Sequence, residues 1–182
     1  MHIPLATTNY EDLIDNGLWI VVDAWAQQPH DDVEMVQNIQ LNQYNHVFLG
    51  HLKEELMKTH VYKEDKIVQI QCKNVINFMQ SHDSKLDPRF EEFQLIDNKE
   101  DLISYIVDRG KVNLILCGLH YGKCITSAAM ILEDAIHIGI EGEEPVLKNR
   151  NLYIKRDMCC LWPGDEINLH DRVYKQMNLE LI

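Results

Sequence analysis

Short apolar runs alternate along the chain with longer stretches in which apolar residues recur every three or four positions. Continuous apolar runs are typical of strands buried on both faces of a parallel sheet, whereas the longer repeat is typical of a helix with one buried face. The runs that predict strands are 18–23, 67–72, 93–96, 112–117 and 151–154. The predicted helices are a turn at 10–13 and the stretches 42–60, 98–110, 121 onward and 165–179. This order predicts an α/β chain.

Polar residues and glycines mark the ends of several predicted elements. Asp97 or Asn98 is suited to cap the helix that follows the third strand, and Gly110 is suited to end it. The pair 163–164 breaks the chain before the last helix. Residues 73–90 show little periodicity and predict no element. We expect one domain over residues 1–182, with a three-layer Rossmann-like fold, a mainly parallel sheet and helices on both faces.

The stretch 112–130 carries the most chemical information. Its apolar strand ends in a turn containing Gly118 and Gly122, and small residues after the turn predict a helix packed close to the sheet. Cys124 therefore lies where the strand becomes the helix. Unpaired N–H groups of a first helical turn, together with the helix dipole, favour a thiolate over a thiol. Cys124 is a candidate nucleophile, although a free cysteine can also be a small packing residue.

A second reactive residue, Asp23, closes the first predicted strand. Ligands bind outside the carboxyl ends of strands in such sheets, where both Asp23 and Cys124 are expected. A carboxylate beside a thiol can accept its proton and leave an activated nucleophile. Trp25 would face the mouth of the pocket or form the edge of the core. His120, on the loop before Cys124, would face the pocket or the surface.

Composition narrows the function classes. The chain has 182 residues, a net charge of −12, 46% hydrophobic residues and 25% charged residues. The negative charge argues against nucleic-acid binding, which needs clustered Lys and Arg. No run reaches membrane-spanning length, and no secretory signal is visible. Five cysteines without metal-site spacing predict free thiols in a reducing compartment, so we expect a cytoplasmic protein.

The remaining motifs argue for packing roles and against a cofactor. Cys117 lies inside an apolar strand and is expected in the core, and the adjacent Cys159 and Cys160 are expected to pack. The run 159–162 would belong to the core or to a contact between subunits. The nine histidines lack metal-binding spacing, and no glycine-rich nucleotide-binding loop occurs, so no metal or cofactor is expected.

Three segments, in order, resemble the isochorismatase-like cysteine hydrolases. Residues 19–27 are similar to that family's first strand and catalytic aspartate, and 114–129 to its nucleophile strand, loop and helix. Residues 153–160 are similar to the strand that follows. The resemblance implies a six-stranded parallel sheet and an Asp–Lys–Cys triad, with Asp23 as base and Cys124 as nucleophile. Lys85, which precedes Phe90, best matches the family's lysine, and Lys73 is the alternative.

The resemblance also implies a reaction. The Cys124 thiolate would attack a small amide-type substrate, and the backbone N–H groups of Lys123 and Cys124 would form the oxyanion hole. Trp25 and His120 would contact the substrate. The family commonly forms oligomers, which predicts a homo-oligomer here. The chain departs from the family pattern at Tyr121, where the family usually has Thr.

The tyrosine at position 121 and the open choice between Lys85 and Lys73 leave a second hypothesis: a catalytically degenerate member that uses the fold as a binding or assembly module. A Rossmann-like nucleotide binder is the third, and it lacks a glycine fingerprint.

Overall fold

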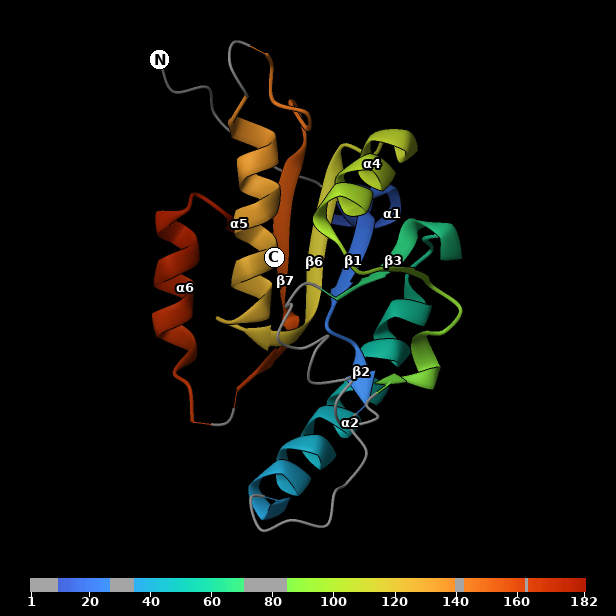
Figure 1. Ribbon diagram of the computed structural model, residues 1–182, viewed down its shortest axis with the longest axis vertical. Coiled ribbons are helices and arrows are strands. Elements are labelled where there is room, and N and C mark those ends of the chain that lie inside the picture. Colours follow the sequence, from blue (N-terminus) through green and yellow to red (C-terminus); the bar gives the residue numbers. More distant parts are fainter. Residues whose placement is uncertain (1–9, 27–34, 71–84, 140–142, 163) are drawn as a thin grey trace.

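A six-stranded parallel sheet forms the centre of the computed structural model, which describes residues 10–26, 35–70, 85–139, 143–162 and 164–182 (Figure 1). Every pairing in the sheet is parallel. In spatial order the strands are β5 (Gln94–Ile96), β3 (Lys66–Gln69), β1 (Leu18–Val22), β6 (Asn113–Tyr121), β7 (Asn151–Leu161) and β8 (Glu180–Leu181). Parallel neighbours require crossover connections, and helices supply them.

Helices cover both faces of this sheet. They are α1 (Tyr10–Asn16), α2 (Met35–Lys58), α4 (Lys99–Arg109), α5 (Cys124–His137) and α6 (Ile167–Gln176). In Figure 1, α5 and α6 lie to the left of the strands and α2 lies to the lower right. Side chains of a strand alternate between the two faces, so β1 contributes to two cores. Ile20 packs in the cluster that contains residues of α4, α5 and α6, whereas Val21 packs in the cluster that contains residues of α1 and α2.

The structure therefore confirms the predicted fold class: a three-layer α/β architecture with a parallel central sheet. All five predicted strands are present. Asn98, rather than Asp97, caps α4, because its side-chain oxygen accepts a hydrogen bond from the Asp101 N–H at 2.8 Å. Gly110 ends α4 in the left-handed conformation with φ of 63°, as predicted.

Several predicted boundaries were wrong. β6 extends to Tyr121, so α5 begins at Cys124 and not at residue 121. β7 continues past 154 to Leu161, because buried residues recur beyond the charged segment that interrupts its apolar run. α2 begins at Met35 rather than near 42, and α6 occupies Ile167–Gln176 rather than 165–179. The pattern also failed to predict β8, a two-residue edge strand too short to carry a periodicity signal.

Residues 85–90, within the segment that predicted no element, contain two short ones. β4 (Lys85–Leu86) pairs antiparallel with β2 (Trp25–Ala26), and η2 (Pro88–Phe90) follows as a single 3-10 turn. A further 3-10 turn, η1 (Lys63–Asp65), leads into β3. Among the described helices, none combines the length and the apolar character that a membrane span requires.

Candidate functional site

The candidate site lies at the carboxyl ends of β1 and β6, two neighbouring strands at the centre of the sheet. The last paired residues of these two strands are Val22 and Gly118, and Asp23 is the next residue after β1. Asp23 is buried, at 1% exposure, and has a left-handed backbone with φ of 53°. Its N–H donates to the carbonyl of Gln69 at 2.9 Å, so β3 holds the chain as it turns away from the sheet.

Gly118 permits an unusually close approach of these two strands. Its φ is 113°, and a Cβ atom there would lie 2.4 Å from the Val22 carbonyl oxygen. That oxygen belongs to the backbone of β1, so no side-chain rotation could relieve the contact. The glycine therefore allows β6 to pass beside the residue that precedes Asp23.

The turn after β6 places Cys124 as the first residue of α5. Cys124 is half-buried, and Lys123 immediately before it occupies the N-cap position. The Lys123 side chain makes no capping hydrogen bond, whereas its backbone N–H donates to the carbonyl of His120 at 3.0 Å. The Lys123 carbonyl in turn accepts from Ser127 N–H at 3.0 Å. The turn is thus closed by backbone hydrogen bonds, and the nucleophile predicted from sequence lies at the positive end of a helix dipole.

Lys85 lies on β4, beside the segment that follows Asp23. Ala26 is its partner in the antiparallel pair, and Trp25 pairs with Leu86. Asp87 N–H donates to the carbonyl of Ala24 at 3.0 Å, which extends this contact toward Asp23. The structure therefore brings the backbone of Lys85 to the candidate site. The side chains of Lys85 and Trp25, and the whole of Lys73, lie outside what the structure describes.

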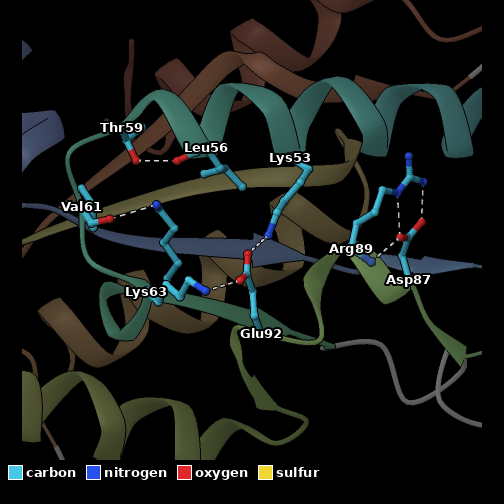
Figure 2. Close-up of polar contacts among 9 residues, drawn as sticks. Lys53, Leu56, Thr59, Val61, Lys63, Asp87, Arg89 and Glu92 are labelled. Carbon is cyan, nitrogen blue, oxygen red and sulfur yellow. Dashed lines mark hydrogen bonds and ion pairs between the residues drawn. The ribbon is translucent and has the colours of Figure 1, made fainter.

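An ion pair between the buried Asp87 and the partly exposed Arg89 follows the strand that carries Lys85 (Figure 2). Asp87 is 1% exposed, and its carboxylate accepts from Arg89 Nε at 2.8 Å and from the Arg89 terminal nitrogen at 2.5 Å. Arg89 also donates to the carbonyl of His46 on α2 at 3.0 Å. Burial alone would raise the pKa of Asp87, but the hydrogen bonds and charge of Arg89 outweigh it and lower that pKa. Gly50 leaves room for the guanidinium, since a Cβ there would lie 2.7 Å from it.

A second ionic cluster lies farther along the same helix. Figure 2 shows Glu92 between the ammonium groups of Lys53 and Lys63. Hydrogen bonds from both lysines lower the pKa of Glu92 to about 2. Lys53 also lies over the Phe93 ring, 4.2 Å from its centroid. These contacts attach α2 to the segment after η2, so the chain that follows Lys85 is anchored to α2 at two points.

His120 is packed between α2 and Trp162, the residue after β7. It follows a cis peptide bond after Leu119, is 4% exposed, and its Nε2 lies 2.9 Å from the side-chain oxygen of Asn45 on α2. Since an amide oxygen only accepts, Nε2 carries the proton in this pairing. The Trp162 and imidazole rings pack edge to face, with their centroids 4.8 Å apart. Lys123 Nζ lies 4.2 Å from the centroid of the same Trp162 ring. Burial and then the charge of Lys123 lower the pKa of His120 to about 4.

Tyr121, which stands where the family usually has Thr, points toward α6. It is 1% exposed, and its hydroxyl donates to Asp171 at 2.7 Å. Arg156 donates to the same carboxylate from Nε at 3.1 Å and from its terminal nitrogen at 2.9 Å. Burial and the neighbouring Asp171 raise the pKa of Tyr121, which keeps the hydroxyl protonated as the donor. Tyr121 is thus a buried link to α6.

The other described cysteines behave as packing residues. Cys117 is fully buried in β6, as predicted, and burial raises its pKa. Cys159 and Cys160 pack within β7, as predicted. Burial raises the pKa of both thiols, that of Cys160 to about 11. Within the described residues, no three His, Cys, Asp or Glu side chains are grouped as a metal site.

Sequence reasoning placed Trp162 only in the core or at a subunit contact, and it missed Asn45, Asp171 and Tyr174. The last two contact the turn from α6, and a helix interior gives no sign of which distant loop it will meet. Asn45 carried one usable signal, because it is a polar residue at a helical position among apolar ones. Its neighbours Leu49 and Leu52 are buried in the core, as Asn45 is.

Comparison with known proteins finds similar folds among solved structures but no match by sequence. No family model matches the chain, and no curated protein sequence matches it. Among solved structures, the YcaC gene product of Escherichia coli, described as an octameric hydrolase of unknown specificity, is similar with a TM-score of 0.52 and 15% identity. That similarity covers 93% of this chain and 76% of the other.

An isochorismatase-like hydrolase from Alkaliphilus metalliredigens is similar with a TM-score of 0.53 and 12% identity, over 91% of this chain and 93% of the other. The chain therefore has the fold of the isochorismatase-like hydrolases, as the sequence resemblance implied.

Proposed function

We propose that this chain is a divergent isochorismatase-like hydrolase that cleaves a small amide-type substrate through Cys124. The observation that supports the proposal is that two reactive residues follow the carboxyl ends of two neighbouring strands. Asp23 follows β1, Cys124 follows β6, and the strands are paired up to Val22 and Gly118. Lys85 is the proposed third member, supported by the pairing of β4 with the segment after Asp23.

In the proposed reaction, Asp23 accepts the thiol proton of Cys124 and the thiolate attacks the carbonyl carbon of the amide. The tetrahedral intermediate collapses with cleavage of the C–N bond, and the amine leaves with the proton from Asp23. Water then attacks the thioester, with Asp23 again accepting a proton. Release of the carboxylic acid returns the proton to the Cys124 sulfur. Lys85 would keep Asp23 ionised in the resting enzyme.

The N-terminus of α5 supplies the proposed oxyanion hole. Backbone N–H groups of Lys123 and Cys124 would donate to the developing negative charge, and the helix dipole would add to the stabilisation. The Lys123 N–H donates to the His120 carbonyl in this structure, so its use by a substrate requires that this hydrogen bond be shared or exchanged. His120 and Trp25 would border the substrate.

In this proposal the enzyme acts in the cytoplasm on a small molecule and needs no cofactor or metal. Nucleic acid and membranes are not among its proposed partners. A homo-oligomer is part of the proposal, since the similar YcaC protein is described as octameric. Analytical ultracentrifugation of the purified chain measures that state directly.

The test of the nucleophile needs no substrate. Iodoacetamide labelling at pH 6, mapped by mass spectrometry, should modify Cys124 on the order of 10- to 100-fold faster than free cysteine, which is almost fully protonated there. Asp23→Asn should slow that labelling to the rate of free cysteine. Turnover of a panel of small amides should then disappear in Cys124→Ala and persist in Cys159→Ala, the matched control.

Two results would contradict the proposal. One is turnover undiminished in Cys124→Ala. The other is labelling of Cys124 no faster than that of free cysteine, which would favour a non-catalytic binding or assembly module. One observation favours the non-catalytic module: position 121, where the family usually has Thr, is Tyr121, and its hydroxyl contacts Asp171.

A further inference from the structure

Helix α6 meets the turn that carries Cys124 through three residues on consecutive turns of one helix face. His170 and Tyr174 both contact Gly122, and Asp171 contacts Tyr121. Residues spaced by three and four positions share one side of a helix, so these contacts form one surface. In Figure 1, α6 runs beside α5.

Tyr174 makes the central contact. Its side chain is fully buried, and its hydroxyl accepts a hydrogen bond from the Gly122 N–H at 2.9 Å. The same hydroxyl lies 2.9 Å from Thr126 Oγ1. Gly122 is two residues before Cys124 and Thr126 is two residues after it. One buried hydroxyl therefore bridges the turn and the first turn of α5 across the candidate nucleophile.

We propose that Tyr174 is a positioning residue that fixes the Cys124 turn through its hydroxyl, which makes α6 part of the catalytic machinery. This inference rests on the proposed function, since it assigns Tyr174 a role in the reactivity of Cys124. Tyr174 acts by holding the backbone on both sides of Cys124.

The surroundings of the bridge leave the turn little freedom. Gly122 has φ of 80°, and a Cβ at this position would lie 2.1 Å from the His170 ring. His170 is itself held by Asp165, whose carboxylate oxygen lies 3.2 Å from its Nε2. The turn thus abuts α6 directly, with no room for a side chain between them.

A second link, beside the first, ties Tyr121 to the same helix. Its hydroxyl donates to Asp171, which Arg156 of β7 also binds. The Tyr121 and Tyr174 rings are 4.9 Å apart and tilted by 54°. Tyrosine at position 121 is therefore matched to α6: it supplies the hydroxyl and ring that this helix contacts.

The experiment compares Tyr174→Phe with Tyr153→Phe. The first removes only the bridging hydroxyl. The second removes the hydroxyl of another buried tyrosine, which lies in the core cluster on the α2 side of the sheet. Backbone hydrogen exchange of residues 122–126 measures the order of the turn, and iodoacetamide labelling of Cys124 between pH 5 and pH 9 measures its reactivity.

We expect faster exchange of residues 122–126 in Tyr174→Phe, and labelling of Cys124 slower by on the order of tenfold at pH 6, because small displacements of a reacting group have large kinetic effects. Tyr153→Phe should change neither. Thr126→Val, which removes the other side of the bridge and keeps the Tyr174 ring, should act in the same direction and serves if Tyr174→Phe does not fold.

The two readouts separate this inference from the proposed function. Ordinary labelling of Cys124 in the unmodified chain contradicts the proposed function, and with it the assignment of Tyr174 to catalysis. Rapid labelling in the unmodified chain that is unchanged in Tyr174→Phe and Thr126→Val overturns the positioning role alone. Equal exchange of residues 122–126 in Tyr174→Phe and Tyr153→Phe overturns it as well.

Discussion

Replacing Gly118 with alanine tests the close packing of β1 and β6 that brings Asp23 and Cys124 to one edge. The new methyl group would lie 2.4 Å from the Val22 carbonyl oxygen and 2.8 Å from the Val22 nitrogen. Both atoms are backbone, so the two central strands must separate or twist to admit it. The φ of 113° adds a second penalty, since L-residues rarely adopt it.

The expected loss combines these two effects. A left-handed backbone costs a non-glycine residue roughly 1–2 kcal/mol, and overpacking of a well-packed core costs roughly 1–3 kcal/mol. Together they predict that the free energy of unfolding falls by about 2–5 kcal/mol. For a chain of this size a loss of about 3 kcal/mol lowers the melting temperature by roughly 6–12 °C.

Gly110→Ala is the matched control. Gly110 also has a positive φ, 63°, but no atom lies within 4 Å of its virtual Cβ. Only the backbone penalty of roughly 1–2 kcal/mol applies, so the melting temperature should fall by about 2–8 °C. Urea unfolding and calorimetry of both variants give the comparison. Equal losses in Gly118→Ala and Gly110→Ala would refute the close approach of β6 to Val22.

Two further predictions concern charged groups near the site. Arg89→Met should lower the free energy of unfolding by about 2–4 kcal/mol at pH 7, because it leaves the buried Asp87 carboxylate without its cation. Lys148→Met, in an exposed pair, should cost under about 1 kcal/mol, and a similar loss in both variants would contradict the argument. The pKa of His120 is lower in the folded chain, at about 4, than its ordinary value of 6.5, so protonation favours unfolding. Between pH 6.5 and pH 4 the free energy of unfolding of the native chain should therefore fall by up to about 3 kcal/mol. His120→Gln should not show this fall, and urea titrations at each pH measure both proteins. His137→Gln, an exposed control, should retain the native slope.

The fold could be predicted from sequence because its determinants are local. Uninterrupted apolar residues at 18–22 and 114–117 required strands buried on both faces, and the intervening amphipathic stretches required covering helices. Boundaries were less predictable where polar residues occupy a strand. β7 runs through Lys155, Arg156 and Asp157, and opposite them its pairing with β6 shifts register between Leu116 and Gly118. Arg156 N–H donates to the Ile182 carbonyl at 3.0 Å, and the apolar pattern gives no sign of this irregularity.

The candidate site was partly predictable for the same reason. Asp23 and Cys124 follow apolar strands, so topology alone placed them at one edge. Asn45, Asp171 and Tyr174 could not be found in this way, because each reaches the site through the packing of a whole helix. Their partners lie far away in sequence, and the polar side chains carry no pattern that names those partners.

These contacts account for a tyrosine at position 121 in a chain that has the fold of the isochorismatase-like hydrolases. Threonine is too short to reach a carboxylate on a helix beyond the turn, whereas the Tyr121 hydroxyl spans that distance and donates to Asp171. Asp171 would be costly to bury alone, but it lies half-buried with Arg156 as a second donor. Tyr121 is therefore coupled to a donor on β7, Arg156, and to an acceptor on α6, Asp171. Under the proposed function, this network holds the turn of the nucleophile through its contacts with α6 and β7.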